Sequence, residues 1–200
     1  MLKQDSALAE RITAAVKDIE ARTSAELVVV VAARSDPYQE AAWAAGAAGG
    51  WVALAFLAWS PVSFDGLWFP VDVLMVGGIT GWLAGRSRHA RQWLTRRSRR
   101  DACVQMAARS AFMEEAVHGT RAHTGVLVYV SVLEEQVILL PDEALLGRVP
   151  RARWNEVRLD ATSEDAFDTS LRALGDRLAT WLPPTDGDNP DEIADAPRFR

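Results

Sequence analysis

The sequence lacks several features that would assign a function class. Cys103 is the only cysteine in 200 residues, so no intramolecular disulfide can form, which fits a reducing compartment. Residues 1–6 contain no apolar signal region, and we therefore expect the start of the chain to stay in the cytoplasm. The sequence has no nucleophile elbow, phosphate-binding loop, Cys-x5-Arg motif or paired-aspartate motif, so no motif assigns an enzyme class.

Charge is almost absent from one long stretch. Residues 41–64 contain no charged side chain, and residues 67–85 contain only Asp72. Each run has about 20 residues, the length with which a helix crosses roughly 30 Å of hydrocarbon. The short break at 61–66 suits a turn, so the pattern predicts a two-helix transmembrane hairpin over residues 41–85. The alternative is a buried hairpin in a soluble core, for which so short a chain leaves little protein to cover two apolar helices.

Aromatic and basic residues are placed as a membrane hairpin would need them. Five of the eight tryptophans lie in or between the apolar runs, mostly near their ends, where indole rings favour the headgroup layer: Trp43, Trp51, Trp59, Trp68 and Trp82. Seven arginines then fall within Arg86–Arg100, here called the basic collar. They predict that this end faces the cytoplasm and binds anionic lipid headgroups. Nucleic acid is the rival partner, but no interleaved aromatics or recognised fold accompany the arginines, so we expect none.

Strand patterns lie on both sides of the hairpin. Residues 26–32 and 124–131 are uninterrupted apolar runs rich in β-branched residues, typical of central strands buried on both faces. Residues 136–140 follow after a short turn and predict an antiparallel partner for the second strand. A helix-containing connection joins the first two strands, so we expect them to be parallel, with a right-handed crossover.

Helical spacing of apolar residues predicts a first helix over residues 5–22 and a last one over residues 162–182. A third helical pattern runs over residues 88–118, with an expected break near residues 100–101. The predicted fold is a small three-layer α/β sandwich with a mixed sheet, interrupted by the transmembrane hairpin. Its parts are residues 1–40 with 101–184 as the α/β domain, 41–85 as the hairpin, 86–100 as the collar, and 185–200 as an acidic, disordered tail.

Three segments share their order and spacing with a known family. They are residues 12–30, with the motif Thr23-Ser24-Ala25-Glu26, residues 111–142, with Thr124-Gly125-Val126-Leu127, and residues 171–193. In this combination they resemble the TPM domain, and specifically its bacterial membrane branch. The resemblance implies an α/β fold, a membrane protein and a phosphatase-like activity. It also implies a divalent metal in some members, so Ca²⁺ or Mg²⁺ is the candidate cofactor.

Acidic residues stand where predicted strands begin or end. Glu26 opens the first strand, and Asp142 and Glu143 follow the third. Carboxylates in such places can hold a divalent cation or act as a general base, but they also cap helices and stabilise turns. Both interpretations stay open for these residues.

Two further groups are candidates for a site. Glu114 and His118 are four residues apart in a helical pattern, so they could share a face and bind a metal, with Asp142 as a third candidate ligand; the alternative is a solvated face. Arg121 and Thr124 lie between a helix end and a strand, where they could bind an oxyanion. A turn stabilised by hydroxyl groups is the alternative. No residue is identified as catalytic.

These observations lead to two functional hypotheses. The first is a non-enzymatic module at the inner membrane, multi-pass, with both termini cytoplasmic, that binds a membrane protein as its partner. The alternative is a divalent-metal-dependent phosphatase-like hydrolase, in which Glu26, Asp142 or Glu143 holds the ion.

Overall fold

The computed structural model describes residues 6–61, 68–184 and 193–200. The chain divides into two compact units. The first, here called the α/β unit, comprises Met1–Ser35 and Ala102–Arg200. The second, here called the helical unit, comprises Asp36–Asp101. Each unit is described by itself.

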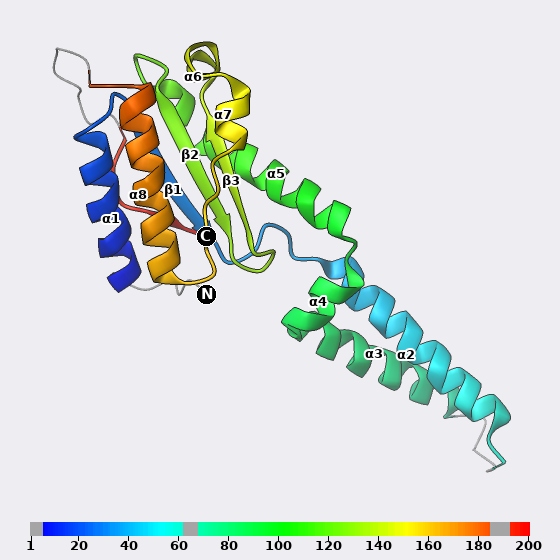
Figure 1. The fold of residues 1–200 in the computed structure, drawn as a ribbon. Helices are drawn as coiled ribbons and strands as arrows, with labels where there is room; N and C mark the ends of the chain where they lie inside the picture. Colours follow the sequence, from blue (N-terminus) through cyan, green and yellow to red (C-terminus); the bar gives the residue numbers. More distant parts are fainter. Residues whose placement is uncertain (1–5, 62–67, 185–192) are drawn as a thin grey trace. The chain divides into compact units, whose positions relative to one another are not determined.

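A four-stranded mixed sheet forms the centre of the α/β unit, in the order β3-β2-β1-β4 (Figure 1). Strands β1 (Glu26–Ala32) and β2 (Gly125–Ser131) are parallel, with Glu26 opposite Gly125. Strand β3 (Gln136–Pro141) runs antiparallel to β2, which confirms the predicted mixed sheet. Every residue of β1 and β2 is buried, as expected for apolar runs in central strands.

The fourth strand was not predicted. Strand β4 (Arg198–Phe199) pairs in parallel with β1, opposite Val30 and Val31. The expectation of a disordered tail over residues 185–200 is therefore wrong for its last residues, and residues 185–192 lie outside the described part. Two backbone bonds extend the pairing, because Arg200 donates its N–H to Val31 and accepts from the N–H of Ala33. Backbone pairing of this kind does not depend on apolar composition, which is why the acidic sequence gave no sign of it.

Helices cover both faces of the sheet, so the predicted three-layer arrangement is confirmed (Figure 1). Helices α1 (Ser6–Glu20) and α8 (Glu164–Trp181) pack on one face, and the buried residues of α5 (Arg97–Glu114) pack on the other. The side chains of the strands alternate between these layers, as the pleat requires. The side chains that pack toward α1 and α8 are Leu27, Val29, Val31, Val126, Val128 and Val130. Those that pack toward α5 are Val28, Val30, Ala32, Leu127 and Tyr129.

Helices α1 and α8 pack closely because of one glycine. A Cβ added at Gly175 would lie 2.5 Å from Cγ1 of Ile19, closer than two carbon atoms can approach. Ser163 begins α8 as its N-cap, and its Oγ accepts the N–H of Ala166 at 3.1 Å. The segment before α8 contains two short helices, α6 (Glu143–Arg148) and α7 (Arg151–Asn155), which bring Leu145 and Trp154 into the core.

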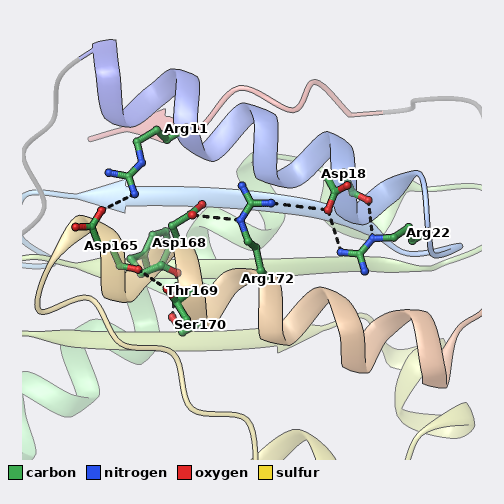
Figure 2. A network of polar contacts seen from close by, with 9 residues as sticks. Arg11, Asp18, Arg22, Asp165, Asp168, Thr169, Ser170 and Arg172 are labelled. Carbon is green, nitrogen blue, oxygen red and sulfur yellow. Dashed lines mark hydrogen bonds and ion pairs between the residues drawn. The ribbon is translucent and has the colours of Figure 1, made fainter.

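Ion pairs cross the outer surface between α1 and α8 (Figure 2). Arg11 donates to Asp165 at 2.8 Å, and Arg22 pairs with Asp18 of its own helix and with Asp176 of α8. Arg172 lies 3.9 Å from Asp18. Because the arginines and most of these carboxylates are exposed, solvent screens the charges and each pair contributes little stability. The pairs account for charged residues on this surface and leave the apolar stripes of both helices for the core.

The helical unit contains α2 (Gln39–Trp59), α3 (Phe69–Arg86) and α4 (Arg88–Leu94), with α2 and α3 side by side (Figure 1). Glycines allow this approach: a Cβ at Gly46 would lie 3.0 Å from the carbonyl oxygen of Gly77. The expected turn at 61–66 falls almost entirely outside the described residues. Within the described part of the chain, α2 alone is long and apolar enough to cross a membrane.

The predicted helix over residues 88–118 is interrupted at a different place. Thr95 has extended backbone angles, so α4 ends at Leu94 and α5 begins at Arg97, a few residues before the expected break. The helix also ends early, at Glu114, because Ala116 takes a positive φ of 52°. A short 3-10 turn, η1 (Val117–Gly119), follows.

Candidate functional site

Three of the predicted site residues meet at one end of the sheet. Glu26 donates its backbone N–H to the carbonyl oxygen of Thr124 at 3.1 Å, and Asp142 donates its N–H to that of Gly125 at 2.9 Å. Glu26, Thr124 and Asp142 therefore lie on neighbouring strand ends, where β1 and β2 begin and β3 finishes. This is the edge opposite to the carboxyl ends of parallel strands, where open α/β sheets usually bind ligands.

Asp142 has a defined local role. One of its carboxylate oxygens accepts the N–H of Glu143 at 2.6 Å, which makes Asp142 the N-cap of α6. The other oxygen lies 3.2 Å from Nδ1 of His123. Glu143, the first residue of α6, is exposed. His123 lies in a loop, with a φ of 52°, and this loop brings its ring to the buried carboxylate of Asp142.

The predicted oxyanion pair is divided by burial. Thr124 is buried, and its N–H is donated to Oγ1 of Thr120 at 3.0 Å, whereas Arg121 is exposed. A hydroxyl group thus stabilises the turn that leads into β2, which was the alternative interpretation of this segment. Gly125 then passes so close to Val117 that a Cβ would lie 2.1 Å from its carbonyl oxygen.

Three carboxyl groups lie beside this edge, here called the acid cluster: Glu26, which is buried, and Glu20 and Asp195, which are half-buried. Glu20 ends α1 and accepts the N–H of Leu27 at 2.8 Å. Burial raises the pKa of Glu20 to about 8, aided by repulsion from Glu26 and Asp195 and opposed by the bond from Leu27. Lys17 Nζ lies 3.6 Å from Oδ2 of Asp195.

The acid cluster was only partly predicted. Glu26 was a candidate because it opens the first predicted strand, whereas Glu20 was not among the predicted site residues. Asp195 lies in the segment expected to be disordered. The one sign of the acid cluster in the sequence was Glu20, an acidic residue six positions before Glu26 and next to the apolar stripe of α1.

The metal candidates are separated. Glu114 and His118 cannot share a helix face as predicted, because α5 ends at Glu114 and the chain turns at Ala116. Glu114 accepts from Oγ of Ser110 at 2.7 Å and pairs with Arg200, and these partners lower its pKa. The His118 ring lies 6.4 Å from that of Phe112. Within the described ranges, no group of three histidine, cysteine or acidic residues is arranged to hold a metal ion.

A second polar network lies at the carboxyl ends of β1 and β2. The carboxylate of Glu134 accepts from the N–H of Ser35 at 3.1 Å and from the hydroxyl of Ser131. Oγ of Ser35 lies 2.6 Å from Oγ of Ser131 and 3.2 Å from the hydroxyl of Tyr129. Burial raises the pKa of Tyr129, against the bond from Ser35. The network fixes Ser35, the last residue of the α/β unit before the helical unit.

Comparison with known proteins supports the fold alone. No protein-family model matches the sequence, and no curated protein matches it. Among solved structures, it is similar to the NMR structure of the BA42 protein from the psychrophilic bacterium Bizionia argentinensis. The TM-score is 0.55 at 14% sequence identity, over 98% of this chain and 94% of the other.

Proposed function

We propose that the protein is a membrane-anchored accessory module, in which α2 and α3 lie in the bilayer and the α/β unit binds a protein partner beside it. The supporting observation is where the apolar side chains of α2 point. Ala41 is its one buried residue, whereas Trp43, Trp51 and Trp59 are each more than 70% exposed. In water such a surface is unfavourable, by about 25 cal/mol for each Å² of apolar area. In hydrocarbon the same surface is favourable.

The sheet topology supports a hairpin rather than a single crossing. Strand β1 precedes α2 and β2 follows α3, yet the two strands pair along their whole length. If α2 crosses a membrane, the chain must therefore cross back to the side of β1 before β2 begins. Helix α3 is the candidate for the return, and both termini would then be on the same side.

The dimensions of α3 fit this role. Its 18 residues rise about 27 Å, close to the roughly 30 Å of a hydrocarbon core. Its two charges lie at its ends, with Asp72 in the first turn and Arg86 in the last, where both can reach the interfaces. The basic collar follows, and we propose that it contacts anionic headgroups on the cytoplasmic face of the inner membrane.

A binding role is preferred to catalysis because several acidic side chains at the ends of the strands and helices already serve the fold. Asp142 caps α6, Glu114 pairs with Arg200, and Glu134 ties Ser35 to Ser131. The hydroxyl of Ser131 donates to a carboxylate, an arrangement that does not activate it as a nucleophile in the way a histidine does. The partner proposed is a membrane protein that meets the α/β unit at the bilayer surface.

Membrane fractionation with topology reporters tests the anchor. The full chain should remain in the membrane pellet after an alkaline carbonate wash, and reporters fused at either end should give the cytoplasmic signal. A chain that stays in solution without detergent, or a reporter signal from outside the cell, would contradict the proposal.

A phosphatase assay tests the accessory role against the hydrolase alternative. The purified chain in detergent is incubated with a generic phosphate ester and Mg²⁺, Mn²⁺ or Ca²⁺. We expect no turnover. Metal-dependent turnover that is lost in Asp142→Ala but kept in Asp160→Ala, an exposed aspartate elsewhere in the unit, would favour the hydrolase.

A further inference from the structure

The helical unit has an apolar groove between α2 and α3. Its volume is about 770 Å³. Its floor is formed by residues without large side chains, among them Gly46, Gly77 and Gly81, and Trp43 and Trp82 stand on its sides. Both indoles are more than half exposed, so they border the groove without filling it.

One end of the groove is basic. Gly85 and Arg86 are its last lining residues on α3. The guanidinium of Arg86 lies over the Trp82 ring, 5.0 Å from its centroid, and Arg91 of α4 donates to the carbonyl oxygen of Gly85. Arg86 of α3 and Arg91 of α4 therefore each contact a lining residue, Trp82 and Gly85, at this end of the groove. A groove that is apolar along its length and cationic at one end complements an amphiphile with an anionic head.

The groove is long enough to hold an acyl chain. Along α3 it runs from Val73 to Arg86, which is about 20 Å at 1.5 Å per residue. Half of a roughly 30 Å hydrocarbon core is about 15 Å, so the acyl chain of a lipid in one leaflet fits within this length. An acyl chain can therefore lie along the glycines while its phosphate is at the level of Arg86.

We propose that this groove holds one anionic phospholipid of the leaflet next to the basic collar, with an acyl chain between α2 and α3 and its phosphate bound by Arg86 and Arg91. The proposal rests on the proposed membrane anchoring. It goes beyond general attraction of the collar to a charged surface, because it assigns a particular lipid to a shaped site. A helix from a second copy is the competing occupant, and the experiment below separates the two.

The test uses the full chain in nanodiscs of phosphatidylcholine with a minor fraction of phosphatidylglycerol, released into detergent for native mass spectrometry. The key variant is Gly78→Leu, because Gly78 lines the groove and a Cβ there meets nothing within 4 Å. A leucine side chain at this position would project into the open groove without meeting α2 at its Cβ. Ala58→Leu adds the same bulk at an exposed position of α2 outside the groove.

We expect the wild-type chain and Ala58→Leu to retain one phosphatidylglycerol, and Gly78→Leu to lose it. Arg86→Gln should lower the preference for phosphatidylglycerol over phosphatidylcholine about fivefold, as expected for one cation near a charged headgroup. Arg96→Gln removes an exposed arginine of the same collar that does not line the groove, and should leave the preference nearly unchanged.

Two outcomes would overturn the lipid site. One is a wild-type chain that inserts into nanodiscs but retains no lipid, or retains it equally in Gly78→Leu. The other is a dimer that Gly78→Leu converts to a monomer, which would assign the groove to a second copy. Failure of the anchoring itself is distinct, because the wild-type chain would then not enter nanodiscs at all.

Discussion

The two units of the chain differ in where their large apolar side chains lie. In the α/β unit, β1 and β2 are completely buried, and the stripes of α1 and α8 close over them. In the helical unit, α2 and α3 pack through glycines and turn their large side chains outward, including Leu74, which is 74% exposed. A sheet with helices on both faces hides apolar side chains from solvent, whereas two helices that pack through glycines leave their large apolar side chains exposed.

The largest expected effect is the difference in stability between two Leu→Ala substitutions, one in each unit. Leu171→Ala removes a fully buried side chain of α8 and should lower the free energy of unfolding by about 3 kcal/mol. Leu74→Ala removes an exposed one and should change unfolding of the α/β unit by less than about 0.5 kcal/mol. Near-UV circular dichroism in urea, with the protein in detergent, measures both. Equal losses would mean that the exposed surface of α3 packs against protein.

A charge introduced in the middle of α2 tests whether this helix lies in hydrocarbon. Val52 is 70% exposed, so Val52→Arg creates no clash within the protein, but an arginine at the centre of a crossing helix costs about 3 kcal/mol. The variant should be depleted from the carbonate-washed membrane fraction, and Val52→Leu should not. If Val52→Arg stays in the membrane as the wild type does, α2 does not cross the hydrocarbon.

The smallest expected effect concerns the acid cluster and depends on pH. Because the pKa of Glu20 is raised from 4.5 to about 8 in the folded protein, the fold holds a proton that the unfolded chain releases. The contribution of Glu20 to the free energy of unfolding should therefore be fully present below pH 4.5 and be lost as the pH rises toward 8. Glu20→Gln keeps an acceptor for Leu27 without the charge, so above pH 8 it should be more stable than wild type by about 1 kcal/mol.

Thermal unfolding at pH 5 and pH 9 measures this difference. At pH 5 the two proteins should be nearly equal. The exposed Glu10→Gln serves as the matched control and should show no difference at either pH. A wild-type stability that rises between pH 5 and pH 9 relative to Glu20→Gln would contradict the assignment.

Local pattern was enough to predict much of the α/β unit. Strands β1, β2 and β3, and the stripe of Leu8, Ile12 and Ile19, follow directly from apolar periodicity. The features that apolar periodicity did not predict depend on contacts between distant segments. Strand β4 forms only because β1 offers an open edge, and the acid cluster forms only when Asp195 returns to Glu20. The Glu114 and His118 pair failed for a local reason, the positive φ of Ala116, which sequence spacing does not reveal.

The parallel pairing of β1 with β2 has a consequence for biogenesis. The ribosome completes β1 about 100 residues before it finishes β2, so β1 has no neighbouring strand while the intervening helices are made. Closing so long a loop costs conformational entropy, but two antiparallel helices that have already associated bring its ends together and shorten the effective loop. Assembly of α2 with α3 should thus precede and speed completion of the sheet, which makes the inserted hairpin a folding aid for the domain it divides.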